Sequence, residues 1–277
     1  MNINVSIGDF SPLLRSPEYL FRGLQDTGVD GVELWIGIKS RWTPEYYLRL
    51  SKKYHLPIVS VHQPLWAMTG LYFDEGFFTV AQRLGVQYVT CHPLPRKSLD
   101  DKEMQAYFER LAAIQQRSGL QILIENMPQG NRSKLLQLVV PHENDSTSVL
   151  DLCRHITPFG LKMTLDTDHV HVPKPQGEPW FNTVFPYIQN IHLSSYAGDN
   201  RHLPLTTGEL DAVGLVHQLK AKHYGGLITL EVSAPKSITM LHYDFGCIRR
   251  SVGLAVAVSP LVLRVRLSAV AGVLETS

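Results

Sequence analysis

Acidic and imidazole side chains stand at the ends of several apolar segments that we interpret as β-strands. The segment 161–169, LKMTLDTDH, places Asp166 after an apolar run and His169 three residues later. Carboxylate oxygens and imidazole nitrogens are ligands that proteins offer to divalent metals. Such groups are costly at the end of a buried strand unless they have a partner. This segment therefore indicates a metal or catalytic site.

The same placement recurs along the chain. The seven segment ends concerned carry Glu33, His62, His92, Glu125, Asp166, His192 and Glu231. Three further groups, His169, Asp199 and His202, follow in the loops after the sixth and seventh segments. Gathered at one place, so many such groups would be poorly solvated unless a cation joined them. We therefore expect one divalent metal, for which Mn²⁺, Co²⁺, Mg²⁺ and Zn²⁺ are all suitable. The expected ligands are Glu125, Asp166, His192 and Glu231.

A fold that brings strand ends together must position these groups. Strand-like and helix-like segments alternate throughout the sequence. The expected strands are residues 3–8, 31–37, 57–63, 87–93, 121–128, 161–169, 190–196 and 227–233. The expected helices are residues 17–27, 44–54, 73–84, 100–118, 146–156, 180–188, 211–224 and 237–255. Eight such units predict an α/β fold, a single (β/α)8 TIM barrel with its metal site at the C-terminal face of the strands.

Alternation within the strands predicts which side chains face the barrel interior. In the fifth segment Ile122 and Ile124 share one face, whereas Leu123 and Glu125 share the other. The apolar faces are expected to pack under the helices, so the polar groups at the strand ends meet at the barrel mouth. Cys91 falls on the outer face and is interpreted as a packing residue. We expect residues 1–256 to form the barrel, and residues 257–277 to pack on it or at a homo-oligomer interface.

Several of these residues also have an ordinary structural explanation. A single histidine at a strand end is more often hydrogen-bonded than metal-bound, and a single buried glutamate is more often part of a salt bridge. For His62 and His92 the two explanations stay open, as they do for Asp199 and His202. Glu33 is expected beside the ligands or against the substrate. The aromatic residues Trp35 and Trp66 either line a substrate face or cap the barrel.

Composition limits the functional classes. The chain of 277 residues has a net charge of +1, so no overall basic field favours nucleic acid. Three cysteines without paired spacing indicate a reduced, cytoplasmic protein. The amino-terminal sequence has no pattern of a signal peptide, and we see no uncharged apolar run long enough to span a membrane. We therefore expect no membrane partner.

Short motifs in a fixed order resemble the xylose isomerase-like (β/α)8 superfamily, which also contains endonuclease IV. They are GVELW (31–35), VHQP (61–64), CHP (91–93), IENMP (124–128), LDTDH (165–169), IHLSS (191–195), HLPLTTGELD (202–211) and LEVS (230–233). Each motif is short, but their order is specific for the superfamily. The resemblance extends to about residue 233.

The isomerase and epimerase branch of the superfamily holds one metal with the four expected ligands. The resemblance implies a small sugar or sugar-phosphate substrate and proton transfer through a metal-bound enediolate. Glu125 and Glu231 would flank the reacting carbon as the catalytic pair, and His169 and Arg201 would bind substrate oxygens. Glu33, Trp35 and Trp66 are the other substrate-binding candidates.

The endonuclease IV branch holds two or three zinc ions and acts on DNA. Its ligand pattern maps onto His62, His92 and Glu125, then onto Glu125, Asp166, His192 and Glu231, and finally onto His169, Asp199 and His202. The sequence departs from this branch because Asp199 and His202 lie three residues apart instead of two, and because GVELWIGIKSRW differs from its DNA-engaging segment. Lys39, Arg41 and the PRK of 95–97 are the basic candidates at the mouth, and we expect them to belong to solvated loops rather than to a DNA-binding surface.

We therefore expect a divalent-metal-dependent sugar isomerase or epimerase. The alternative is a multinuclear zinc phosphodiesterase or AP endonuclease, for which DNA is the partner. A second alternative is a barrel that binds a ligand without catalysis.

Overall fold

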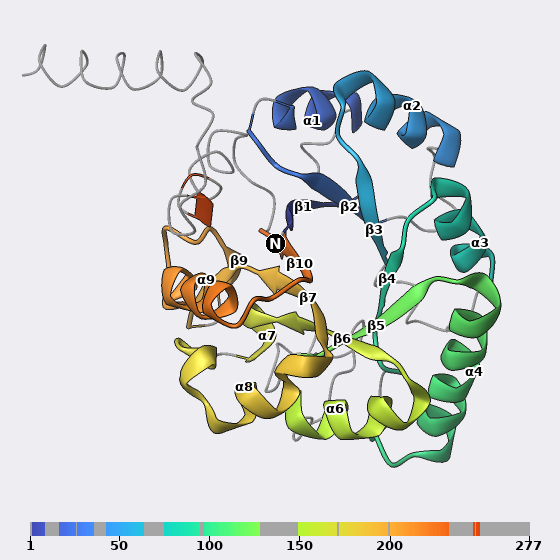
Figure 1. The fold of residues 1–277 in the computed structure, drawn as a ribbon, viewed down its shortest axis with the longest axis vertical. Helices are drawn as coiled ribbons and strands as arrows, with labels where there is room; N and C mark the ends of the chain where they lie inside the picture. Colours follow the sequence, from blue (N-terminus) through green and yellow to red (C-terminus); the bar gives the residue numbers. More distant parts are fainter. Residues whose placement is uncertain are drawn as a thin grey trace, which may run out of the picture.

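A computed structural model describes residues 2–8, 17–25, 27–35, 43–63, 75–94, 97–127, 149–170, 172–198, 200–232, 246 and 248–249. Parallel strands close into a barrel in the order β1-β10-β7-β6-β5-β4-β3-β2, as Figure 1 shows from one end. These strands are β1 (Asn2–Gly8), β2 (Gly31–Trp35), β3 (Ile58–His62), β4 (Tyr88–Cys91), β5 (Gln121–Glu125), β6 (Lys162–Asp166), β7 (Ile188–Leu193) and β10 (Leu227–Leu230). The predicted (β/α)8 architecture is confirmed.

Helices surround the barrel and connect successive strands (Figure 1). They are α1 (Pro17–Leu24), α2 (Pro44–Tyr54), α3 (Glu75–Leu84), α4 (Lys102–Ser118), α6 (Val149–Ile156), α7 (Thr167–Val170), α8 (Pro179–Val184) and α9 (Ala212–Ala221). Short 3-10 turns, η2 (Thr157–Phe159), η3 (Pro175–Gly177) and η4 (Phe185–Tyr187), lie between them. The start of α2 follows its local signal, because the Thr43 hydroxyl accepts a hydrogen bond from the Tyr46 amide and Pro44 begins the helix.

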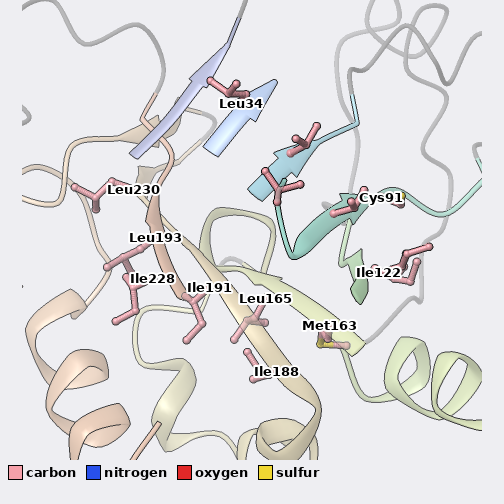
Figure 2. Close-up of a cluster of buried hydrophobic side chains, with 14 of the residues drawn as sticks. Leu34, Cys91, Ile122, Met163, Leu165, Ile188, Ile191, Leu193, Ile228 and Leu230 are labelled. Atoms are coloured by element: carbon pink, nitrogen blue, oxygen red, sulfur yellow. The ribbon is translucent and has the colours of Figure 1, made fainter. Parts of the chain in front are cut away.

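The apolar face of each strand packs outward against the helices, as alternation predicts. Figure 2 shows Met163, Leu165 and Ile191 on this outer face, and all three are fully buried. Cys91 belongs to the same apolar core, which confirms its interpretation as a packing residue. Burial raises the pKa of its thiol. The outward face thus supplies the apolar burial that stabilises the barrel.

Polar side chains fill the barrel interior below the mouth. The Ser60 hydroxyl donates to Glu33 Oε2 at 2.8 Å, and Asn190 Nδ2 donates to the same oxygen at 3.4 Å. The Thr229 hydroxyl donates to Asn190 Oδ1 at 2.9 Å. These residues are fully buried, so the hydrogen bonds offset the loss of solvation. The predicted inward direction of the polar face is confirmed.

Two segments differ from the expected pattern. The sixth strand ends at Asp166, and His169 lies in the single-turn helix α7 instead of the strand. The expected seventh strand divides into β7 and a separate antiparallel hairpin, β8 (Ser195–Ala197) with β9 (Asn200–Leu203). The hairpin occupies the region that the sequence indicates as a glycine-containing loop. Its pairing involves few residues, so local periodicity carries little signal for it.

Parts of the sequence-based interpretation lie outside the described residues. They include Trp66, Asp199, Lys39, Arg41, most of the expected helix at 237–255 and the whole tail at 257–277. Among the helices of the described ranges, none combines the length and the apolar character needed to cross a membrane.

Candidate metal centre and active site

Glu125 lies at the centre of the site, at the carboxyl end of β5. Its Oε1 accepts a hydrogen bond from His192 Nδ1 at 2.7 Å. Its Oε2 lies 3.3 Å from His62 Nε2 and 3.0 Å from His92 Nε2. One carboxylate therefore joins imidazoles that come from three other strand ends, and its residue is only 1% exposed. The sequence-predicted convergence of strands three, four, five and seven is present in the structure.

Glu231 approaches the same edge of His192 as Glu125 does. Its Oε2 lies 2.6 Å from His192 Nδ1, the same nitrogen that donates to Glu125. A single N–H serves one acceptor well, and Glu231 Oε2 has no hydrogen-bond partner among the described residues. The backbone amide of Glu231 donates to the Leu193 carbonyl at 3.2 Å, which ties its position to β7. Two carboxylates thus face one imidazole edge.

Glu33 approaches the other edge of the same imidazole. Its Oε1 lies 3.1 Å from His192 Nε2, although the two atoms are not aligned for a hydrogen bond. Ser60 and Asn190 hold the second oxygen of Glu33 from below. Fully buried Glu33 therefore lies between His192, a candidate metal ligand, and the polar residues of the barrel interior.

Opposite charges control the protonation of these groups. Burial alone would lower the pKa of His192, but Glu231, Glu33 and Glu125 outweigh burial and raise it well above its usual value. Burial alone would raise the pKa of Glu125, yet His192 and His62 hold it well below its usual value. His192 likewise outweighs burial at Glu231 and lowers its pKa to about 2. An imidazolium therefore balances ionised carboxylates in this arrangement.

Asp166 and His169 form the neighbouring part of the site. Asp166 Oδ1 accepts hydrogen bonds from the amides of Asp168 at 2.7 Å and His169 at 3.2 Å, in the first turn of α7. Asp166 Oδ2 is buried and has no hydrogen-bond partner within the described ranges. Burial, together with the charges of Glu231 and Glu125, raises the pKa of Asp166 well above its usual value. This carboxyl group needs either a proton or another positive charge.

In two histidines a backbone carbonyl oxygen fixes which ring nitrogen carries the proton. His169 Nδ1 donates to the Asn126 carbonyl at 2.8 Å, and His62 Nδ1 donates to the Gln63 carbonyl at 2.8 Å. Since a carbonyl only accepts, Nε2 is the nitrogen left to accept a metal or a proton. Burial lowers the pKa of His169 to about 3, so its imidazole is neutral at physiological pH.

The donor groups fit a divalent cation. Two sets have ligand atoms within 4.8 Å of one another: His62, Glu125, His192 and Glu231 in the first, and Asp166, His169 and His202 in the second. Each set contains one buried carboxylate oxygen without a hydrogen bond to any described residue, from Glu231 in the first and from Asp166 in the second, and a cation bound there would compensate it. Of the four ligands expected from sequence, three fall in the first set and Asp166 falls in the second. His62 joins the first set beside them.

The remaining candidates lie around this centre. Trp35 stacks on His62, with ring centroids 4.2 Å apart and planes inclined by 19°. Arg201 is in β9, and its Nη1 donates to the Asp168 carbonyl at 2.6 Å. His202 follows it, 5.5 Å from the His169 ring between centroids. The structure therefore gathers every described candidate at the same end of the barrel.

Two residues that sequence reasoning passed over organise the site. The side chain of Asn126 bridges strand ends, because its Nδ2 donates to the Asp166 carbonyl at 3.0 Å and its Oδ1 accepts from the Asp166 amide at 2.8 Å. Asp168 is fully buried and contacts both Arg201 and His202. Their position inside the IENMP and LDTDH motifs, directly beside predicted ligands, was the available signal.

The chain is similar to several known proteins. An uncharacterized protein of Mycobacterium tuberculosis (strain ATCC 25618 / H37Rv) is 26% identical over 135 residues, which is 46% of this chain and 47% of the relative. The match thus spans about half of that protein's length. The apo crystal structure of the E. coli 3-keto-D-glucoside 4-epimerase YcjR is 16% identical, with a TM-score of 0.66, and the match covers 90% of this chain and 99% of YcjR.

A second solved structure, an AP endonuclease of family 2 from Brucella melitensis, is also 16% identical and gives a TM-score of 0.67. That match covers 87% of this chain and 96% of the Brucella chain. At these identities the two structures establish a shared fold. The family model "Xylose isomerase-like TIM barrel" matches residues 21–245, most of the chain. The chain therefore belongs to the xylose isomerase-like TIM barrel family.

Proposed function

We propose that this protein is a divalent-metal-dependent isomerase or epimerase of a sugar or sugar phosphate. One observation carries the proposal: Glu125 and Glu231 approach the same nitrogen of His192, at 2.7 and 2.6 Å, from different strand ends. Two carboxylates this close can serve as a base and an acid for one reacting carbon. The resemblance of the fold to the sugar epimerase YcjR is consistent with this chemistry.

The reaction needs a proton to leave a carbon beside a carbonyl and to return at another face or atom. Glu125 and Glu231 have lowered pKa values, so both are ionised at neutral pH and either can accept the proton. The carboxylate that accepts it then becomes the acid that returns it. Both residues are at least nine-tenths buried, which keeps bulk water away from the reacting carbon. A divalent cation held by Glu125, Asp166, His192 and Glu231 would supply a Lewis acid for the carbonyl oxygen.

Groups at the rim would bind the remaining oxygens of the substrate. His169 uses Nδ1 for its hydrogen bond to the Asn126 carbonyl, which leaves Nε2 to contact a substrate. The guanidinium of Arg201 lies at the same end of the barrel. Both are hydrogen-bonding groups suited to hydroxyl and carbonyl oxygens. Trp35 stacks on His62 and so places an apolar aromatic side chain beside the site, where it could contact the carbon skeleton of a sugar.

A multinuclear phosphodiesterase is the second candidate, and the paired ligand sets around His62 and His202 favour it. Binding of a DNA backbone, however, calls for free basic groups. Of the basic residues that the sequence indicates at the mouth, Lys97 is the one within the described ranges. Its Nζ lies 2.9 Å from Glu103 Oε2 and 3.6 Å from Asp101 Oδ2. Its charge is already compensated, so we rank this candidate below the isomerase.

Replacing either proposed proton carrier tests the main proposal. E125Q and E231Q keep the shape of each side chain but remove the ability to accept a proton. We expect each change to lower kcat by about 100-fold or more. The measurement is incorporation of deuterium from D2O into ketoses and ketose phosphates, followed by NMR, with H155A at the barrel periphery as the control. Exchange that persists at the wild-type rate in both variants would contradict the assigned roles.

His92 separates the two enzyme candidates. In a one-metal isomerase, H92A leaves Glu125 in contact with His192 and His62, so kcat/KM for the sugar should fall less than about tenfold. In a multinuclear hydrolase the same change removes a ligand, so cleavage of an abasic-site duplex should be lost together with zinc. Wild-type protein that is inactive in both assays would instead support a binding barrel.

Metal binding should depend on pH. Asp166 and His192 have raised pKa values, so protons compete with a cation for both groups. Binding should therefore release at least about one proton per ion, and affinity should weaken as the pH falls. Calorimetric titration with Mn²⁺ in two buffers of different ionisation enthalpy measures this release. Identical heats in the two buffers would refute the predicted displacement.

A further inference from the structure

Asp168 is a buried carboxylate that the proposed proton transfer does not use. It lies in α7 between Asp166 and His169 and is fully buried. Its Oδ1 accepts a hydrogen bond from the backbone amide of His202 at 3.0 Å. Its Oδ2 lies 3.5 Å from Arg201 Nη1 and 3.7 Å from His202 Nε2. A single carboxylate thus contacts two consecutive residues of β9.

We propose that Asp168 is the positioning residue that fixes the β8–β9 hairpin over the barrel mouth and directs Arg201 and His202 toward the site. The inference rests on the proposed function, in which Arg201 meets the substrate. The proposed role explains why a carboxylate, rather than an apolar side chain, occupies the buried position 168. The backbone carbonyl of Asp168 accepts from Arg201 Nη1 at 2.6 Å, so the guanidinium is held by both the main chain and the side chain of one residue.

The hairpin needs such an anchor. Among its described residues, pairing is limited to Ser195 with Leu203 and Ala197 with Asn200, and a short two-stranded hairpin is marginal in water by itself. His202 also has φ of +49°, in the left-handed region that residues with a side chain seldom adopt. Such a conformation persists when surrounding contacts impose it. The hydrogen bond from the His202 amide to Asp168 Oδ1 is one of those contacts.

The other contacts of His202 connect the anchor to the site. His202 Nδ1 lies 3.3 Å from the Ser194 hydroxyl and 3.2 Å from the Glu231 carbonyl. The amide of Asp168 donates to Asp166 Oδ1 at 2.7 Å. Asp168 therefore links a metal-ligand candidate at the end of β6 to the hairpin, so that a change in one would be felt by the other.

Two substitutions at position 168 separate the contributions of the side chain. D168A removes the acceptor and the charge, whereas D168N keeps an acceptor oxygen of the same shape. In D168A we expect amide hydrogen exchange of residues 200–203 to accelerate at least about tenfold, with the strands β5 and β6 unchanged. D168N should restore most of the protection. The exposed acid Glu209, which accepts a hydrogen bond from the Gly198 amide at 3.3 Å, provides the control variant E209Q.

Wild-type exchange of residues 200–203 in D168A would overturn the proposal. Acceleration spread evenly over the barrel strands would also overturn it, because it would indicate a general role in stability. Failure of D168N to restore protection would exclude the hydrogen-bond role. The hydrogen-exchange measurements need no substrate, so they test the role of Asp168 even if the protein turns over no sugar.

Kinetics supply the second readout once a sugar substrate is found. D168A should raise KM at least about tenfold and change kcat by less than about threefold, because Arg201 would bind substrate less well while the carboxylate pair is intact. A fall in kcat with unchanged KM would contradict a positioning role. Sugar turnover combined with unchanged exchange in D168A would leave the proposed function intact and refute only the role of Asp168.

Discussion

Burial of several carboxylates around one imidazole is the constraint on which this structure depends. Glu33, Glu125 and Glu231 all lie within about 3 Å of a nitrogen of His192, and the first two are almost completely removed from water. Leaving a buried carboxylate uncompensated costs several kcal/mol, so the site requires positive charge. Protons on His192 and Asp166 can supply it, and a divalent cation can supply it better because it satisfies the unpartnered oxygens as well.

The barrel makes this concentration of charge tolerable. Its outer face packs apolar residues such as Leu165 and Ile191 under the helices, which supplies stability far from the site. Its interior face holds the charged layer with neutral hydrogen bonds, as Ser60 and Asn190 do for Glu33. Because closure fixes every strand end relative to its neighbours, the candidate ligands are positioned before any substrate arrives.

The sequence predicts the strand ends well, since a period of two separates inward from outward residues within a few positions. Glu125, His192 and Glu231 were found in this way, without any knowledge of their contacts. The same pattern gives no information on how deep in the barrel a side chain lies, so two roles stay open for Glu33 from the sequence. Asp168 and the β8–β9 hairpin were not predicted, because their arrangement depends on tertiary contacts and on a left-handed residue, His202, that local periodicity does not indicate.

The metal content of the protein tests this account most directly. Protein purified without chelator or affinity-tag nickel should contain about one divalent ion per chain when measured by elemental mass spectrometry, most consistently manganese or cobalt. Two or three zinc ions per chain would contradict the one-metal isomerase and transfer support to the multinuclear hydrolase. Protein that contains no metal and binds none on addition of Mn²⁺, Co²⁺, Mg²⁺ or Zn²⁺ would contradict the central claim that the carboxylates around His192 form a metal centre.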